Sequence, residues 1–450
     1  MNLEDWSAHK LHAIEKIHAI ERLGTVGQVV SNTVYASLPN AAIGELCFVF
    51  KDSSRKEHLL GEVVAFDGDK AMISCLEPVT GISNGASVLA LNFSHRIRVH
   101  DDLLGKILDG FGRPMGSKDF EGALSLTANA TPVIAQAPNA SDRPPIDSAF
   151  TTGLTVIDGL MTLGRGQRVG VFAGPGCGKS TLLAQIARGA DADVIVLGLV
   201  GERGRELREF LEREFDEEMV SRTVFVCSTS DKSAIERVRA AFTATAIAEK
   251  FRDEGKSVLL MIDSLTRLAR AQREIGLMTG EPATRNGFTP SVYALLPTLI
   301  ERAGRTDQGD ITAIYTILLE TDEISDDPIA SEAKSLLDGH IILSKDLVYK
   351  SHFPAIHVLN SLSRVMVSVV DSEHIRTGRA VREIYSRYKD VELLLRINEY
   401  QRGVDPKNDS AIELKPKLDN ILKQELDVYV DLNDGMSELS AIAEEFYQAS

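Results

Sequence analysis

Residues 169–182, VGVFAGPGCGKSTL, constrain the fold of this chain more than any other segment. An apolar run ends there in a glycine-rich turn, and a lysine then leads into a helical pattern. Backbone N–H groups of such a turn point inward toward anionic oxygens, and the positive end of the helix dipole adds to the attraction. The segment therefore predicts a strand, a phosphate-binding loop and a helix, in that order.

The loop matches the pattern G-x-x-x-x-G-K-[ST] at every position except the first, where Ala173 stands in place of glycine. The glycines that follow still allow a flexible turn, and the strand, helix and Lys-Ser pair in register argue against a chance glycine-rich connection. The Lys179 ammonium is expected to reach the β- and γ-phosphates of a nucleotide, and the Ser180 hydroxyl to bind Mg²⁺. The residues expected to bind the nucleotide are Gly174, Pro175, Gly176, Cys177, Gly178, Lys179, Ser180 and Thr181.

Length and composition bound the class of protein. A chain of 450 residues is too long for one ordinary core, and 44% hydrophobic with 25% charged residues is typical of a soluble globular protein. The formal net charge of −16 argues against a surface that binds nucleic acid, so no nucleic-acid partner is expected. Four dispersed cysteines, no apolar run of membrane-spanning length and no signal-peptide pattern predict a reduced, cytoplasmic protein.

Residues 1–23 are predicted to form an amphipathic helix. Its apolar positions, Trp6, Leu11, Ile14 and Ile17, recur at near-helical spacing among charged residues. The helix either packs on its neighbouring domain or docks on another protein, and the residues alone leave both open. Because it precedes a compact domain and belongs to no obvious core, we expect docking.

Three larger domains are predicted to follow. Residues 24–99 are short alternating runs between turns, which predict a small β-barrel; its few aromatic, Lys and Arg residues favour a structural collar over an oligonucleotide-binding barrel. In residues 100–370, apolar runs alternate with helical segments, which predicts a parallel, doubly wound sheet with ligands at the carboxyl ends of its strands. Residues 371–450 lose the strand signal and predict a helical C-terminal domain, broken at Gly403 and Pro406.

Two carboxylates end apolar runs of the predicted α/β domain. The run 257–262 is followed by Asp263. Apolar strands often end in Asp, and the spacing behind a phosphate loop is what favours a carboxylate that binds Mg²⁺ here. The run 194–200 leads to Glu202, which would face the same crevice and orient a water against the γ-phosphate. Capping of the next helix is the other explanation for Glu202 and Glu206, and these residues in isolation favour it.

Four segments together resemble one family. The loop AGPGCGKS, the box LVGERGRE, the strand LLMIDSLTR and the later HFPAIHVLNSLSRVM occur in the order and at the separations of type III protein-secretion ATPases. This family includes flagellar export and injectisome ATPases and is related to the catalytic subunit of rotary ATP synthases. The resemblance extends from Gly24 to about Asp405. It implies a P-loop, RecA-like core whose ATP hydrolysis energises chaperone release, unfolding and export of secreted proteins.

The resemblance also implies a role for each site residue. Lys179 is expected to clamp the phosphates, while Ser180 and Asp263 hold Mg²⁺. Glu202 is expected to be the catalytic carboxylate, with Arg203 as its neighbour in the site.

Two later positions match family features as well. Arg364 in SLSRVM matches an arginine finger that reaches into the nucleotide site of the adjacent subunit. Phe353 matches an aromatic residue that stacks on adenine, although an ordinary core aromatic explains it nearly as well. An arginine supplied in trans is worth roughly 10³–10⁵ in the rate of phosphoryl transfer, so hydrolysis is expected to depend on assembly into a homohexamer.

The implied partners are a stator protein bound through residues 1–23, a coiled-coil central stalk, and chaperone–substrate complexes bound through the C-terminal domain. The protein is expected at the cytoplasmic face of the inner membrane, associated peripherally through the secretion apparatus. An injectisome is slightly favoured over a flagellum. The loop 280–291 departs from the family pattern at Asn286, Phe288 and Thr289, which leaves its contact with the stalk open.

Two other functions share parts of this pattern. A ring-shaped RNA translocase has the same recombinase-like core, but the acidic balance and a β-domain with few aromatic residues oppose it. A non-catalytic nucleotide-binding subunit of a rotary motor is opposed by Glu202.

Overall fold

The computed structural model describes residues 23–115, 130–320 and 324–449. The described residues form two compact units: one runs to His95 and includes Met278–Gly280, and the other contains the remainder. The helix predicted for residues 1–23 lies outside the described residues, except for Leu23, which begins a strand. Among the described residues, no helix has both the length and the apolar character needed to cross a membrane.

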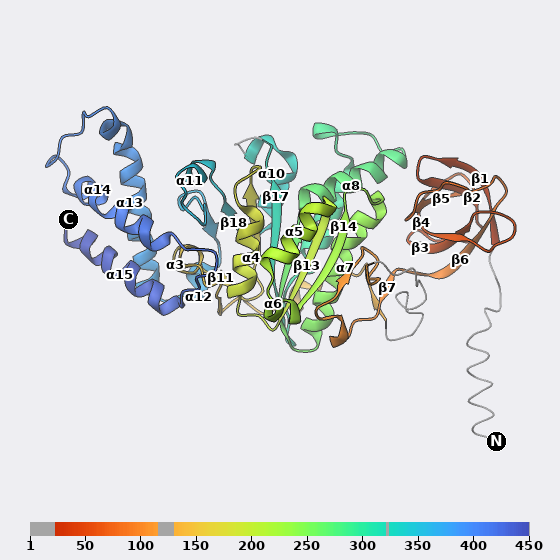
Figure 1. Cartoon of the computed structure of the whole chain (residues 1–450), viewed down its shortest axis with the longest axis horizontal. Coiled ribbons are helices and arrows are strands. Elements are labelled where there is room, and N and C mark those ends of the chain that lie inside the picture. The colour runs from red at the N-terminus through yellow and green to blue at the C-terminus, as the bar shows by residue number, and fades with distance from the viewer. Residues whose placement is uncertain (1–22, 116–129, 321–323, 450) are drawn as a thin grey trace, which may run out of the picture. The chain divides into compact units, whose positions relative to one another are not determined.

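The first unit is a closed antiparallel barrel of six strands within the described residues, in the order β1-β2-β5-β4-β3-β6 (Figure 1). Small apolar side chains that alternate along the strands fill its interior, among them Val34, Val49 and Val88. Closure leaves no edge strand exposed, and the predicted barrel is confirmed. The strands are β1 (Leu23–Val30), β2 (Thr33–Ser37), β3 (Glu45–Phe50), β4 (His58–Asp67), β5 (Lys70–Cys75) and β6 (Ser87–Ser94).

Nine strands of the described chain form the central sheet of the second unit, in the order β19-β18-β12-β17-β15-β13-β14-β8, with β16 paired to β17. All neighbours are parallel except at β16 and β19, which pair antiparallel. The strands are β8 (Ile107–Leu108), β12 (Arg168–Ala173), β13 (Val194–Glu202), β14 (Thr223–Thr229), β15 (Ser257–Asp263), β16 (Gly304–Arg305), β17 (Asp310–Leu318), β18 (Gly339–Ile342) and β19 (Leu362–Ser363).

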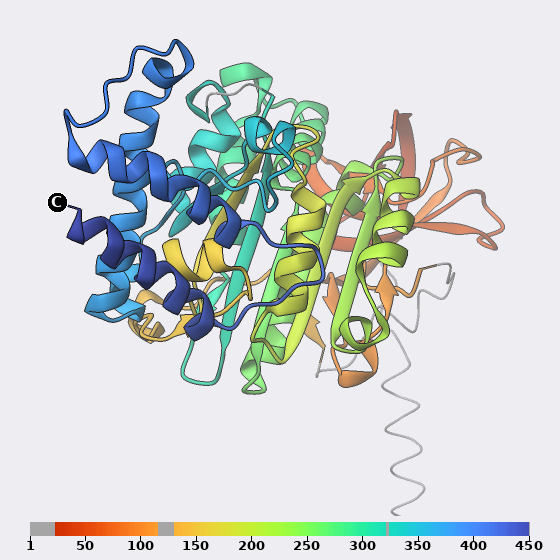
Figure 2. The same cartoon turned by 60° about the vertical axis from the view of Figure 1, so that its left-hand side comes forward.

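Helices cover both faces of this sheet, as a doubly wound fold requires. Leu197 and Leu199 of β13 share a core cluster with Leu182 of helix α4 (Lys179–Gly189). Gly198 lies between them and faces helix α7 (Ala234–Asp253), where an added Cβ would stand 3.1 Å from the Ala244 methyl group. Since successive strand residues point to opposite faces, α4 and α7 lie on opposite sides of the sheet, and the predicted α/β core is confirmed (Figure 2).

Three helices form most of the C-terminal region: α13 (Ser372–Arg396), α14 (Pro406–Leu422) and α15 (Leu432–Gln448). Each begins after an aspartate whose side chain accepts a backbone N–H of the first turn, which satisfies a donor that the helix itself leaves unpaired. They pack on one another and on the short helix α3 (Thr155–Leu160). The predicted helical C-terminal domain is confirmed, and the predicted break at Gly403 and Pro406 falls between α13 and α14.

The remaining elements connect these layers. The helices are α5 (Gly204–Glu214), α6 (Glu217–Ser221), α8 (Leu265–Met278), α9 (Pro290–Ile300), α10 (Pro328–Leu336), α11 (Lys345–Tyr349) and α12 (Met366–Val369). The short strands outside the main sheet are β7 (Arg96–Ile97), β9 (Thr131–Pro132), β10 (Ala149–Phe150) and β11 (Leu163–Gly164). Single 3₁₀ turns are η1 (Asp101–Leu103), η2 (Ala140–Asp142), η3 (Arg285–Gly287) and η4 (Ile324–Asp326).

Candidate active site

The glycine-rich loop connects β12 to α4, as its sequence predicts. Gly176 and Gly178 have φ angles of 76° and 79°, a left-handed conformation in which a Cβ would be strained. Gly178 precedes α4 without a side-chain cap, so N–H groups of the first turn stay available to an anion. Ala173, which replaces the first glycine of the pattern, is the fully buried last residue of β12. Its ordinary strand conformation explains why the loop forms without a glycine there.

Lys179 lies between two carboxylates at the carboxyl ends of neighbouring strands. Its ammonium donates to Asp263 Oδ1, and its Nζ lies 3.8 Å from Glu202 Oε1. The two acids meet because β13 and β15 run parallel in a register that pairs Leu199 with Asp263. The side chains of Lys179, Glu202 and Asp263 are 11%, 14% and 4% exposed. The fold therefore brings three of the predicted site residues into one shielded cluster.

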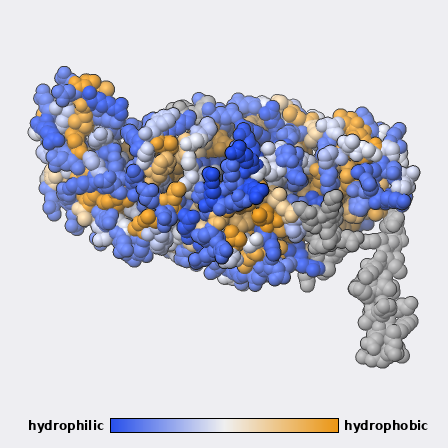
Figure 3. Space-filling model, in the orientation of Figure 1, coloured by the Kyte–Doolittle hydropathy of each residue, from blue (hydrophilic) through white to orange (hydrophobic). Residues whose placement is uncertain are grey.

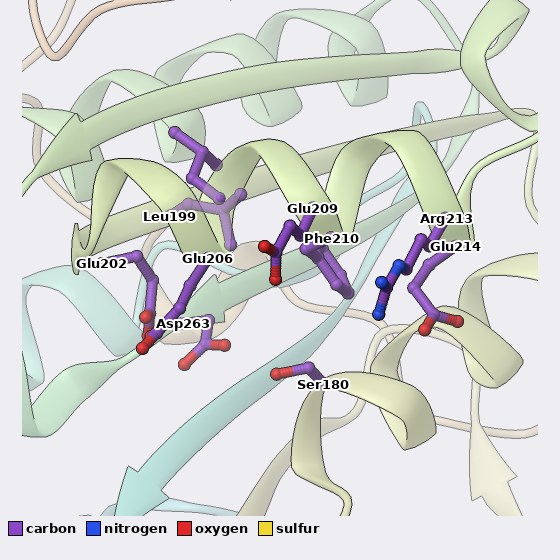
Figure 4. A pocket seen from close by; sticks show the side chains of 10 residues that line it. Ser180, Leu199, Glu202, Glu206, Glu209, Phe210, Arg213, Glu214 and Asp263 are labelled. Carbon is purple, nitrogen blue, oxygen red and sulfur yellow. The ribbon is translucent and has the colours of Figure 1, made fainter.

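Asp263 is held in place by a residue of the next strand. The Thr316 hydroxyl of β17 donates to Asp263 Oδ1 at 2.7 Å, and both residues are buried. Ser180 and Asp263 line the same pocket, in which Figure 4 shows their oxygen atoms. A fixed carboxylate near a hydroxyl offers the oxygen ligands that Mg²⁺ prefers.

Glu202 also has a cationic partner that the sequence reasoning did not single out. Arg267, in the first turn of helix α8, places Nη1 3.0 Å from Glu202 Oε2 and donates to the Gly201 carbonyl. Burial, and then the charge of Asp263, raise the pKa of Glu202, while Lys179 and Arg267 act in the opposite direction. A carboxylate with a raised pKa is a stronger base than an exposed one.

The cluster opens into a pocket of about 290 Å³ under helix α5 (Figure 4). This volume is near the lower end for small-molecule sites. Five of the lining residues are acidic and one is basic, so an anion that enters the pocket is repelled unless cations accompany it. The lining residues are Ser180, Leu199, Glu202, Glu206, Leu207, Glu209, Phe210, Arg213, Glu214 and Asp263.

Arg203, expected beside Glu202 in the site, points to the surface. Its side chain is 77% exposed and pairs with Glu206 at 2.9 Å. Arg267 is the arginine that contacts Glu202. The available signal was the position of Arg267, four residues after Asp263 and hence one helical turn beyond the end of the strand.

One aromatic and one basic side chain, from α11 and the loop after it, lie beside the phosphate loop. The Phe353 ring is half-buried, and its Cε1 lies 3.7 Å from the point where a Gly178 Cβ would stand. Lys345, which sequence reasoning missed, places Cε 3.0 Å and Nζ 3.4 Å from the corresponding point of Gly174. A bulkier residue at Gly174 would therefore collide with this lysine.

Arg364 lies away from the other predicted site residues. It follows the edge strand β19 and is exposed, and its backbone N–H donates to the Asp338 carbonyl at the start of β18. Gly339 pairs with Val169 near the start of β12, whereas the phosphate loop follows the end of that strand. About five strand residues, or roughly 17 Å along β12, separate the position of Val169 from the start of the phosphate loop. Arg364 does not line the pocket of its own chain.

Three family models match successive parts of the chain. The β-barrel domain of the ATP synthase alpha/beta family matches residues 26–92, and the nucleotide-binding domain of that family matches residues 153–363. The C-terminal domain of the T3SS EscN ATPase matches residues 370–441.

Similar proteins include secretion ATPases of several bacteria. The type 3 secretion system ATPase of Pseudomonas syringae pv. syringae is 50% identical over 420 residues, which cover 93% of each chain. The SPI-2 type 3 secretion system ATPase of Salmonella typhimurium is 45% identical over 90% of this chain and 91% of its own, and the flagellum-specific ATP synthase of Bacillus subtilis is 41% identical over 96% and 98%.

The structure of the assembled ATPase EscN from the enteropathogenic E. coli type III secretion system has a TM-score of 0.86 to this chain, at 45% identity. The match covers 93% of this chain and 100% of that one. The fold, the enzyme class and the ATPase role in type III secretion expected from the motifs are thereby confirmed. The chain belongs to the family of type 3 secretion system ATPases.

Proposed function

We propose that this chain hydrolyses Mg²⁺-ATP in the pocket between the phosphate loop and α5, through Lys179, Glu202 and Asp263. The observation that carries the proposal is the shielded cluster that these side chains form at the carboxyl ends of adjacent parallel strands. Ligands of doubly wound sheets bind at this edge. The backbone N–H groups of residues 174–178 and the start of α4 are suited to hold the phosphates.

Mg²⁺ fits the donor set of this pocket. The Ser180 hydroxyl and the Asp263 carboxylate would hold it, and its charge would neutralise that developing on the phosphates. The acidic lining also favours a nucleotide that enters with a cation. Bound phosphates would offer the Lys179 ammonium anions other than Asp263, and that carboxylate could then hold the metal.

Glu202 is proposed to orient the attacking water and accept its proton. Its raised pKa favours proton transfer, and Arg267 holds the carboxylate in one orientation through its ion pair. Phe353 is proposed to contact the base, because its ring stands beside Gly178 at the phosphate loop.

The exposed position of Arg364 supports a role in trans. An arginine at the opposite end of β12 cannot serve its own pocket, but a neighbouring subunit in a ring can present it to the next. The similar EscN ATPase has been solved in an assembled form. We infer a homohexamer in which each site takes Lys179 and Glu202 from one subunit and Arg364 from the next.

The proposed cellular role is the release, unfolding and export of secreted proteins at the cytoplasmic face of the inner membrane.

A central stalk is a proposed partner because EscN has been solved with its central stalk EscO. Exposed Leu393, Ile397 and Val404 leave apolar side chains at the end of α13 and in the loop after it, which suits the binding of stalk or chaperone–substrate complexes. Figure 3 shows hydrophobic surface among hydrophilic surface at the end of the molecule that carries the C-terminal helices. A stator contact through residues 1–23 stays a prediction outside the described residues. The match to the EscN C-terminal domain favours an injectisome over a flagellum.

Replacing Glu202 by Gln tests the chemistry of this site. E202Q keeps the shape of the side chain but removes the proton acceptor, so kcat is expected to fall by at least about 100-fold while Mg²⁺-ATP still binds. E212Q, on the exposed face of α5 and outside the pocket, is the matched control and should keep full activity. Steady-state turnover and equilibrium binding of a fluorescent ATP analogue measure the two effects. Full turnover by E202Q would refute the proposed base.

A further inference from the structure

A buried glutamine links the C-terminal helices to the nucleotide site. Gln424 follows the last turn of α14 and is only 5% exposed. Its side-chain oxygen accepts the Thr155 N–H at 2.7 Å, and its side-chain nitrogen donates to the Gly153 carbonyl at 3.0 Å. The donor on one side and the acceptor on the other fix which way the amide points. The side chain therefore locks the backbone of residue 424 against the start of α3.

That backbone in turn holds the aromatic residue of the nucleotide site. The Gln424 N–H donates to the Phe353 carbonyl at 2.9 Å. The Phe353 ring is the group that stands beside Gly178, with Cε1 3.7 Å from the point where a Cβ would be. This hydrogen bond holds the backbone of Phe353, and the rotamers open to a side chain depend on its backbone conformation.

The segment after Gln424 continues along the helix that begins at the phosphate loop. The Gln185 side chain of α4 donates to the Glu425 carbonyl at 3.3 Å, and Arg188 donates to the Leu426 carbonyl at 2.7 Å. Both donors lie on the helix whose first residue is Lys179. The connection between α14 and α15 is thus tied to the phosphate-binding helix and to the aromatic residue at once.

We propose that Gln424 is a positioning residue for recognition of the nucleotide base, acting through Phe353. The inference rests on the proposed contact of Phe353 with the base and adds the group that sets it. Loss of the Gln424 amide frees the backbone at residue 424, loosens the Phe353 carbonyl and lets the ring leave the base. The Gln424 side chain itself bonds Gly153, Thr155 and Val428, none of which belongs to the phosphate loop, so the groups that hold the phosphates are expected to keep their places.

The test compares a ligand that has a base with one that lacks it. In the full-length, assembled enzyme, Q424A is expected to raise the KM for ATP about tenfold, the loss expected when one base–aromatic stack is weakened, and to change kcat by less than about twofold. Inhibition by inorganic tripolyphosphate, which has no base, is expected to keep its Ki. Q401A replaces an exposed glutamine of the same domain and should match the unmutated enzyme in both measurements.

A double-mutant cycle shows whether Gln424 acts through Phe353. F353A alone should also raise the KM for ATP, and F353A/Q424A should be no worse than F353A. Independent losses that add, or an equal loss of tripolyphosphate binding in Q424A, would overturn the inference. If F353A binds ATP normally, the base contact itself is wrong and the inference falls with it; if F353A weakens ATP and Q424A does not, only the inference fails. Q424M keeps the buried volume and carries the same expectations where Q424A does not assemble.

Discussion

At the level of single residues, the site is governed by the balance of charge around Glu202. Two cations and two carboxylates act on it: Lys179 at 3.8 Å, Arg267 at 3.0 Å, and the carboxylates of Asp263 and Glu206. Burial outweighs the cations, so the pKa of Glu202 stands above that of an exposed glutamate. The same neighbours that hold the carboxylate in place thus also set the pH range in which it can accept a proton.

The pH dependence of turnover follows from this balance. Glu202 acts as a base only when ionised, so kcat should fall as the pH drops through its raised pKa. Arg267 lowers that pKa, and R267M is therefore expected to move the acidic limb of the kcat profile to higher pH. R270M, which removes a more exposed arginine of the same helix, is the control. The measurement is kcat against pH at saturating Mg²⁺-ATP for both variants. An acidic limb that stays in place or moves to lower pH in R267M would contradict the role of Glu202 as the base.

At the level of elements, apolar runs and glycine patterns predicted most of the fold. The buried parallel strands appear in the sequence as continuous apolar runs, and those ending at Ala173 and Asp263 also place the loop and one carboxylate. The two-residue strands β8 and β19 were not predicted because they carry too few residues to show a period. The sequence pattern also does not show in which direction a long side chain points. The spacing places Arg267 about one helical turn beyond Asp263, but it could not show that the Arg267 side chain would turn to Glu202 while that of Arg203 points to solvent.

A buried ion pair joins α7 to the segment just after α9, and its loss should lower the free energy of unfolding strongly. Arg302 is fully buried, donates from Nε to Glu249 at 2.8 Å and also donates to the Val133 carbonyl. R302M leaves the Glu249 carboxylate buried without its partner, so a loss of about 3–5 kcal/mol is expected. R205M, on the exposed face of α5, should change stability by less than about 0.5 kcal/mol.

The midpoint of thermal unfolding of the full chain measures both effects. The double variant R302M/E249L removes both charges and should recover much of the loss, because no uncompensated carboxylate remains. A double variant as unstable as R302M would mean that packing rather than the buried charge sets the cost.

For the whole molecule, the position of Arg364 determines what one chain can do alone. The pocket of a single chain contains the proposed metal ligands and base, but its lining does not include this arginine. A ring with head-to-tail interfaces brings the same two surfaces together at every junction. Each proposed site would then be built from two subunits, and specific activity should rise with protein concentration across the range of assembly.

Mixed rings test this shared site directly. K179A should lack turnover because its phosphate loop is impaired, and R364A should lack it because it supplies no arginine to its neighbour. When the two are mixed, dissociated and reassembled at equal amounts, a junction works if an R364A subunit provides the loop and a K179A subunit provides the arginine. With random head-to-tail assembly that arrangement occurs at about one junction in four, so roughly a quarter of normal activity should return. Mixing K179A with E202Q is the matched control: each working junction then needs both residues from one subunit, and no activity should return. Recovery in the control, or none with R364A, would rule out an arginine acting across the subunit boundary.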